Sequence, residues 1–347
     1  LLGKETSLSG VIAFQLGTSL IVTAWLLAKN RESLIKWLLL IIPATAGIAA
    51  CFYYPMWDRH ALSLSRAHSV DEIANAVRYY SWPETILHGE QIMSDMNKGR
   101  LVYYGDGVGG FTTVLRNYYA MGDTCYSMAN SGKVDASTLG DMGTQTLLGN
   151  LPMLFHPNAR NVMVLGLASG ITAGEVLNFP IERLDVVEIN SQVIDASDFF
   201  LPWNNNVLKD PRTHLIIQDG RAHLALGDRK YDVIISEPSN PWLAGLATLF
   251  TREMFQYACD NLNEGGIFVQ FFHSYQMDWE SFALVGRTFA DVFPNALLVS
   301  TAPSGEGPDY LFVGFRGNGR LSLETAMRNF KYVKRSENVD LRDPRLL

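Results

Sequence analysis

A glycine-rich turn and two carboxylates occur where buried strands are expected to end. The turn, Gly166-Leu167-Ala168-Ser169-Gly170, follows an apolar run, and Glu188 ends the next such run. Asp219, followed by Gly220, ends a third. The carboxyl ends of parallel strands meet at one edge of a sheet, so these groups are expected to share a crevice. Glu188 can accept hydrogen bonds from ribose hydroxyls and Asp219 can contact an adenine amine, which predicts a nucleoside-type ligand. No phosphate-binding GKS/T motif accompanies them, which disfavours ATP.

The loop 236–245, which reads SEPSNPWLAG, follows the fourth predicted strand. Its Glu237 can hold or deprotonate an amine, Ser239 and Asn240 can orient it, and Trp242 can exclude water. We therefore predict an amine site beside the nucleoside site. A rigid cap on the sheet edge is the alternative interpretation.

The elements that position these residues alternate between strands and helices. Strands are expected at 161–167, 184–190, 214–219, 231–237 and 265–272, and helices at 171–179, 191–200 and 251–262. Continuous apolar strands with helical crossovers predict an α/β fold with a parallel sheet covered on both faces. A terminal hairpin is expected from 296–301 and 310–315. His273, just beyond the last parallel strand, is expected either to face the crevice or to serve the strand end.

Short alternating runs over residues 99–135 are separated by Gly-rich breaks, which is typical of small antiparallel hairpins. The resulting organisation has five parts. They are two membrane helices (1–57), a helical linker (58–98), a small β domain (99–145), the α/β core (146–320) and a tail (321–347).

Two segments, 6–28 and 37–57, contain no charged residue. Each is long enough to cross a hydrocarbon layer of about 30 Å as a helix. Aromatic residues near the segment ends are typical of membrane interfaces. We predict two transmembrane helices and hence a lipid bilayer as partner, with buried core helices as the alternative. The basic residues of the linker 29–36 favour a cytoplasmic linker, which would place the following chain outside, but Arg59 and Arg66 leave the sidedness open.

Composition agrees with a partly membrane-embedded protein. Hydrophobic residues make up 48% and charged residues only 18% of the 347 residues. The net charge of -7 argues against nucleic acid as the main partner, because phosphate neutralisation needs a basic surface. The three cysteines are far apart and form no CxxC pair, so neither a disulfide framework nor a metal site is predicted.

Several separated motifs together resemble one family. They are NSGKVDAS (130–137), TQTLLGNLPMLFHP (144–157), VLGLASGITAGEVL (164–177), DVVEIN (185–190), DPR and DGR (210–212 and 219–221) and YDVIISEPSNPWLAG (231–245). Over residues 99–315 the chain resembles the spermidine/spermine synthase (polyamine aminopropyltransferase) family. With the preceding apolar segments it is similar to the bacterial membrane-bound branch, described as fused transporter-like/spermidine synthase proteins. That likeness implies a multi-pass protein of the bacterial cytoplasmic membrane.

The resemblance implies a small N-terminal β domain on a Rossmann-like methyltransferase-type core. It also implies transfer of an aminopropyl group from decarboxylated S-adenosylmethionine to an amine such as putrescine, without a metal. The donor nucleoside would lie at Gly166, Ala168, Ser169, Gly170, Glu188, Asp219 and Gly220. Glu237 would deprotonate the attacking amine. The amine pocket would include Asp141, Gln145, Ser239, Asn240 and Trp242. Relatives often dimerise, so a homodimer is a further expectation.

The sequence departs from the family pattern at the site. Ser169 occupies the place of an Asp in the turn, and Ala168 the place of a Gly. Glu237 and Asn240 replace the two acids of the amine loop, and residues 144–146 read TQT instead of Tyr-His-Glu. Three interpretations therefore remain: an aminopropyltransferase with another acceptor, a methyltransferase using ordinary S-adenosylmethionine, or a non-enzymatic subunit of a membrane complex.

Overall fold

The computed structural model describes residues 4–29, 34–53, 59–64, 78–84, 99–118, 123–239, 241, 245–275, 277–302 and 309–334. The chain divides into two compact units. One comprises residues 1–65 and 69–97, and the other comprises residues 66–68 and 98–347. The candidate site lies wholly in the second unit.

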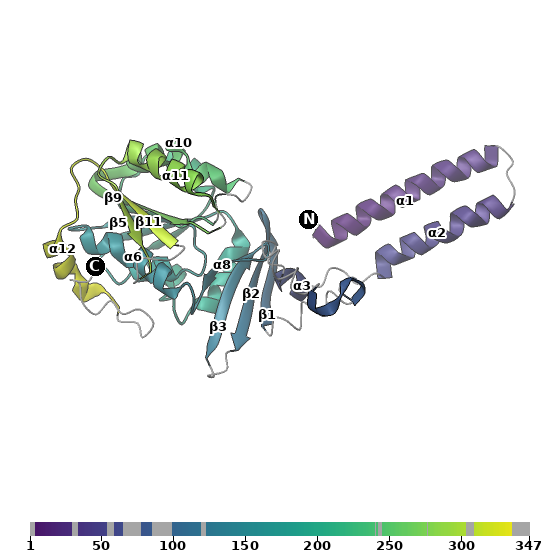
Figure 1. Cartoon of the computed structure of the whole chain (residues 1–347), viewed down its shortest axis with the longest axis horizontal. Coiled ribbons are helices and arrows are strands. Elements are labelled where there is room, and N and C mark those ends of the chain that lie inside the picture. Colours follow the sequence, from purple (N-terminus) through teal and green to yellow (C-terminus); the bar gives the residue numbers. More distant parts are fainter. Residues whose placement is uncertain are drawn as a thin grey trace. The chain divides into compact units, whose positions relative to one another are not determined.

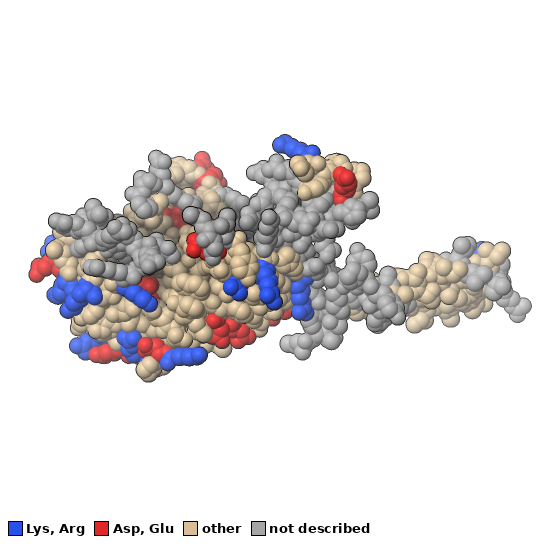
Figure 2. Space-filling model, turned by 90° about the horizontal axis from the view of Figure 1, so that it is seen from below, with Lys and Arg blue, Asp and Glu red and all other residues tan. Residues whose placement is uncertain are grey.

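The first unit contains the helices α1 (Lys4–Lys29), α2 (Leu34–Tyr53) and α3 (Arg59–Leu64). Among the described residues, one helical segment, Gly10–Lys29, is long and apolar enough to span a membrane, with a mean hydropathy of 1.9. The described atoms of α1 and α2, at the right of Figure 2, are almost wholly uncharged. In α2 the apolar stretch Ile35–Gly47 is shorter. Of the two predicted membrane helices, length and hydropathy thus support one, and residues 54–57 of the second lie outside the described residues.

The second unit begins with a four-stranded antiparallel sheet in the order β1-β2-β3-β4. Its strands are β1 (Arg100–Gly107), β2 (Gly110–Tyr118), β3 (Thr124–Asn130) and β4 (Lys133–Ser137). Ser131 and Gly132, which join β3 to β4, have φ of 49° and 81°. Positive φ at both central residues is typical of the tight hairpin turn that matches strand twist. This turn places Lys133 at the start of β4.

A seven-stranded sheet follows, in the order β10-β11-β9-β8-β5-β6-β7. The strands are β5 (Asn161–Leu165), β6 (Arg183–Glu188), β7 (Thr213–Ile217), β8 (Tyr231–Ser236), β9 (Leu262–His273), β10 (Leu297–Ser300) and β11 (Asp309–Phe315). β5 to β9 are parallel, whereas β11 pairs antiparallel with β9 and with β10. The strand order reverses beside β5, because β6 lies on one side of it and β8 on the other. Ligands of open α/β sheets bind at such a switch point.

Helices cover both faces of this sheet (Figure 1). One apolar cluster includes residues of α6 (Met142–Phe155), α7 (Ile171–Val176), α8 (Ser191–Ser197) and α12 (Leu323–Asn329). The other includes residues of α9 (Gly220–Leu226), α10 (Arg252–Asn261) and α11 (Trp279–Val292). Short 3-10 helices lie at Asp198–Phe200, Val207–Lys209, Leu246–Phe250 and Phe330–Tyr332. The predicted two-sided α/β sheet is confirmed.

Several element boundaries differ from the sequence expectation. α7 ends at Val176 instead of residue 179, and Asn178 and Phe179 form single tight turns before Pro180. Proline disfavours helical backbone at the residue before it, which explains the early end. β9 runs on to His273, so this histidine belongs to the strand. The predicted domain boundary at 145/146 falls inside α6.

Phe289 of α11 lies at the centre of an aromatic cluster, 5.1 Å from Phe255, 5.0 Å from Phe293 and 5.4 Å from Phe312 between ring centroids. Its side chain is fully buried. We expect Phe289→Ala to lower the free energy of unfolding by about 3–5 kcal/mol, because it removes a buried ring and leaves a cavity. Denaturant unfolding of the detergent-solubilised chain measures this. Leu284→Ala on the same helix is the control, because Leu284 is 58% exposed, and an equal loss in both variants would contradict the prediction.

Candidate active site

The switch point of the sheet brings the ends of β5, β6 and β8 together. The Gly166 N–H donates to the Val187 carbonyl at 2.9 Å, and the Glu237 N–H donates to the Leu165 carbonyl at 2.9 Å. Gly166 has a φ of 91°, and a Cβ there would lie 2.8 Å from the Glu237 carbonyl oxygen. The turn after β5 and the loop after β8 therefore lie side by side, as predicted from the strand ends. Glycine is required at position 166 by the chain's own backbone.

The remainder of the turn is held by protein contacts. Ala168 has a φ of 44° and Gly170 one of 79°, so an alanine occupies a left-handed conformation that favours glycine. The Ser169 hydroxyl, which is 1% exposed, donates to the Gln145 side-chain oxygen and accepts from the Ile171 N–H at 3.2 Å. The amide of Asn204 donates to the Ser169 carbonyl at 3.0 Å. The Ser169 hydroxyl thus stabilises the turn through contacts within the protein. A ligand at this turn would therefore contact the backbone and not the Ser169 hydroxyl.

Gln145 links this turn to the small sheet. Its side-chain nitrogen donates to the Ser137 carbonyl at 2.9 Å, and the residue is 2% exposed. Its backbone carbonyl also accepts from the Thr172 hydroxyl at 3.1 Å. The Gln145 side chain thus joins Ser169 to the backbone of β4, and its place in an amine pocket stays a prediction.

Glu188 ends β6 with its carboxylate fixed by backbone donors. The Leu167 N–H donates to Oε2 at 3.0 Å and the Asn190 N–H donates to Oε1 at 2.8 Å. Burial raises the pKa of Glu188, and these backbone hydrogen bonds act in the opposite direction. A third backbone hydrogen bond comes from Ile189. A carboxylate has lone pairs for about four hydrogen bonds, so these three contacts leave acceptor capacity for about one more donor. The glycine turn and the predicted ribose acid are thus in direct contact.

Asp219 caps the N-terminus of α9. Its Oδ1 accepts from the Ala222 N–H at 2.7 Å, and Gly220 is the first residue of the helix. This cap fixes the carboxylate at the carboxyl end of β7, next to β6 in the sheet. A contact of Asp219 with an adenine amine stays a prediction.

Glu237 follows β8, and the charges of two other acids act on its carboxyl group. Burial raises the pKa of its carboxyl group to about 8. A hydrogen bond from Thr172 opposes this rise, whereas the charges of Asp141 and Asp135 add to it. A carboxyl group with such a pKa exchanges its proton near neutral pH, as a general base must. Asn240 and Trp242 of the same loop lie outside the described residues.

Asp135 and Lys133 contact Ser239 of the loop after β8, although the sequence predicted a role for neither. Lys133 Nζ lies 2.7 Å from Asp135 Oδ1 and donates to Ser239 Oγ at 3.1 Å. Ser239 Oγ in turn donates to Asp135 Oδ1 at 2.6 Å. The alternation of a strand predicts that residues 133 and 135 share a face, and this was the available signal.

A chain of hydrogen bonds connects this group to Glu188. Asn190 Nδ2 donates to Thr112 Oγ1 at 3.0 Å, and Thr112 Oγ1 donates to Asn130 Oδ1 at 2.7 Å. Asn130 Nδ2 then donates to Asp135 Oδ2 at 2.8 Å. The Asn190 backbone N–H also donates to Glu188. The small sheet therefore connects Glu188 to the Lys133–Asp135 pair through hydrogen bonds.

Further titratable groups surround Lys133. Asp141, the N-cap of α6, and Asp309, at the start of β11, both have a pKa raised mainly by burial. His273 pairs with Asp309 in the sheet register, and burial together with the Lys133 charge lowers its pKa to about 3. His273 is therefore neutral at physiological pH. Its ring stacks on Tyr275 with centroids 4.3 Å apart.

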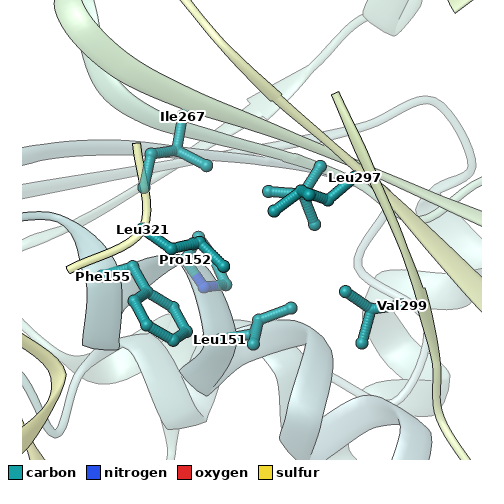
Figure 3. Close-up of a pocket in the computed structure, with 8 residues that line it drawn as sticks. Leu151, Pro152, Phe155, Ile267, Leu297, Val299 and Leu321 are labelled. Carbon is teal, nitrogen blue, oxygen red and sulfur yellow. The ribbon is translucent and has the colours of Figure 1, made fainter. Parts of the chain in front are cut away.

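An apolar hollow lies apart from these groups, between α6 and β9 to β11 (Figure 3). It is lined by Leu151, Pro152, Phe155, Ile267, Leu297, Val299, Val313 and Leu321. Its volume is about 10 Å³, and all its lining residues are apolar. It is a packing gap and not a candidate site.

Among the described residues, no group of three or more His, Cys, Asp or Glu side chains is arranged to hold a metal ion.

A Rossmann-like sheet with a glycine turn, an acid at the end of the second strand and a second acid at the switch point is an arrangement typical of nucleoside-binding α/β proteins. The spermine/spermidine synthase domain model matches residues 142–317, half of the chain. The chain therefore belongs to the spermine/spermidine synthase family.

Individual relatives agree with this membership. The chain is 37% identical over 124 residues to a polyamine aminopropyltransferase of Clostridium perfringens, covering 35% of this chain and 44% of that protein. It is 32% identical over 192 residues to the polyamine aminopropyltransferase of Sodalis glossinidius, covering 54% and 64%. The chain thus spans 44% and 64% of the length of these two curated relatives.

Solved structures confirm the fold. A spermidine synthase from Thermotoga maritima is similar with a TM-score of 0.55 and 26% identity, covering 67% of this chain and 84% of that one. A spermidine synthase in complex with the transition state analogue AdoDATO has a TM-score of 0.56 and 24% identity, covering 67% and 85%. The predicted Rossmann-like core is confirmed, and the small antiparallel sheet is consistent with the predicted β domain.

Proposed function

We propose that the second unit transfers an aminopropyl group from decarboxylated S-adenosylmethionine to an amine. The observation that carries this proposal is the position of Glu237. Its carboxyl group, with a pKa raised to about 8, follows β8 at the switch point, next to the turn that begins at Gly166. The names of the curated relatives and of the solved spermidine synthases support the same reaction.

Glu237 is proposed as the general base. A protonated amine has no lone pair for attack, so its proton must first move to the carboxylate. The free amine nitrogen then bonds to the aminopropyl carbon attached to sulfur. The carbon–sulfur bond breaks, its electron pair stays on sulfur, and neutral methylthioadenosine leaves. The positive charge passes from sulfur to nitrogen, and Glu237 carries the proton away.

The donor is proposed to lie across the ends of β5, β6 and β7. The backbone of the turn comprising Gly166, Ala168, Ser169 and Gly170 would contact the nucleoside near sulfur. Glu188 would accept from the ribose hydroxyls, and Asp219 with Gly220 would contact the adenine. The contact of Glu188 with the Leu167 N–H supports this placement, because it joins the turn to the ribose acid.

The acceptor amine is proposed to lie between Glu237 and the small sheet, next to Asp141 and Ser239. The influence of the Asp141 charge on Glu237 supports this position. Asn240 and Trp242 complete the proposed amine loop from the sequence pattern. We also propose that the segment Gly10–Lys29 anchors the chain in a membrane, with α2 as a second span in a multi-pass arrangement.

Product analysis tests this function. The detergent-solubilised chain is incubated with decarboxylated S-adenosylmethionine and a panel of amines, and mass spectrometry follows methylthioadenosine and the aminopropylated amine. We expect both products in equal amounts. Release of S-adenosylhomocysteine from ordinary S-adenosylmethionine would instead indicate a methyltransferase. Absence of both reactions, together with no binding of methylthioadenosine at millimolar concentration, would favour a subunit without catalysis.

A further inference from the structure

Lys133 places a cation inside the proposed amine pocket. It begins β4 directly after the Ser131–Gly132 turn, and its side chain is 14% exposed. The ammonium lies 2.7 Å from Asp135 Oδ1 and donates to Ser239 Oγ at 3.1 Å. Ser239 is two residues beyond Glu237 on the same loop. The cation is therefore bound to the loop that carries the proposed base.

The Lys133 charge also acts on the other acids of the pocket. It opposes the rise in pKa that burial causes at Asp141 and at Asp309. Burial disfavours the charged form of Lys133 itself, but Asp135 and Tyr275 outweigh this effect and raise its pKa. Lys133 is therefore a permanent cation at neutral pH, surrounded by three carboxyl groups.

A diamine acceptor needs two separate interactions. Its attacking nitrogen must lie at Glu237, and its second nitrogen remains an ammonium that needs a carboxylate partner. Asp135 is the acid whose charge acts on both Glu237 and Glu188, yet it already has an ammonium partner in Lys133. The second acid expected in the amine loop is replaced by Asn240, an uncharged residue. At Asp135 a second ammonium would thus meet an occupied carboxylate and a like charge. At Asp141 and Asp309, whose pKa burial raises, it would meet the charge of the same Lys133.

We infer that Lys133 determines acceptor specificity, because its ammonium takes the place of the second ammonium of a diamine. The acceptor class is then an amine that carries a single positive charge. This inference rests on the proposed function, because it assigns the amine side of the same site. Lys133 is a specificity residue here, and Glu237 keeps the role of base.

Amine binding tests the inference without requiring turnover. Butylamine and 1,4-diaminobutane, which differ by one amino group, are titrated calorimetrically into the detergent-solubilised full chain with methylthioadenosine present. The wild-type chain is expected to bind butylamine at least about tenfold more tightly. Lys133→Met should raise the affinity for 1,4-diaminobutane by about 10- to 100-fold, the range of a charge-assisted hydrogen bond to an ammonium.

Three matched variants separate charge from structure. Lys133→Arg keeps the positive charge and should keep the wild-type preference. Lys133→Gln removes the charge but can still donate to Asp135, so it replaces Lys133→Met if the latter fails to fold. The double variant Lys133→Met with Asp135→Asn removes the released carboxylate and should lose the gain in diamine affinity.

A wild-type chain that binds 1,4-diaminobutane at least as tightly as butylamine would overturn the inference. So would a loss of Lys133 that changes the affinity for both amines equally. Failure of the proposed function gives a different result, namely no binding of methylthioadenosine and no transfer. In that case the titrations without methylthioadenosine still decide whether Lys133 discriminates between the two amines.

Discussion

Glu237→Gln is expected to lower the rate of aminopropyl transfer by about 10²- to 10⁴-fold, the usual contribution of a general base. Glutamine has a similar shape but cannot accept the proton of the attacking amine. The rate of methylthioadenosine release at saturating donor and amine measures the effect. Glu253→Gln is the matched control, because Glu253 is an exposed residue in the first turn of α10.

The pH dependence of the same variant gives a second measurement. Because burial raises the pKa of Glu237 to about 8, the active carboxylate form increases as the pH rises from 7 to 9. The wild-type rate should therefore rise through this range, and the Glu237→Gln variant should lose the inflection near pH 8. An unchanged rate or an unchanged inflection in the variant would remove Glu237 from the proposed mechanism.

The pKa of Glu237 also has a consequence for stability. The folded protein holds this proton more tightly than the unfolded chain, where a glutamate titrates near its ordinary value of about 4.3. The stabilising contribution of the protonated form is therefore complete at acid pH and is lost as the pH rises towards about 8. Glu237→Gln lacks this titration. Its free energy of unfolding relative to wild type, measured by denaturant unfolding, should therefore rise from about pH 4.3 to pH 8 and stay constant above that pH.

Glu188→Gln is expected to weaken methylthioadenosine binding by about 10- to 100-fold, as for the loss of a hydrogen bond to a charged acceptor. The variant removes the negative charge to which the ribose hydroxyls are proposed to donate. In the wild type the Leu167 and Asn190 N–H groups each donate to a separate carboxylate oxygen of Glu188. Glutamine offers one side-chain oxygen for both N–H groups. Calorimetric titration with methylthioadenosine measures the affinity.

Glu182→Gln, just before β6, is the control for this variant, because Glu182 forms an exposed ion pair with Arg160. Melting curves of both variants separate a loss of fold from a loss of binding. If Glu188→Gln keeps its melting temperature and binds methylthioadenosine like the wild type, Glu188 does not hold the ribose. A coincident loss of melting temperature and affinity would assign Glu188 to holding the turn through Leu167.

The predicted class of fold follows from local patterns. Apolar runs such as 162–165 and 233–235 are continuous because both faces of a central parallel strand are buried. The positions of Glu188 and Glu237 were predictable for the same reason, since parallel strands end at a common edge. The glycine at 166 was predictable as well, but its cause is the approach of the Glu237 carbonyl oxygen.

The amine side of the site depends on contacts between distant segments. Gln145 of α6 is 2% exposed and its side chain contacts Ser169 and Ser137, and its place in the amine pocket stays a prediction. Lys133 and Asp135 were not predicted at all. Their partner Ser239 is more than a hundred residues away in sequence, and no local pattern indicates that the two segments meet.

By itself, the sequence determined the order of strands and helices, the apolar N-terminal segment and the acids at the strand ends. These features depend on periodicity and chain direction, which are local properties. Only the tertiary structure decided that the β3–β4 hairpin brings Lys133 against the loop after β8. That contact depends on how the small sheet packs on the core. Long-range packing therefore decides how many free negative charges the amine pocket offers.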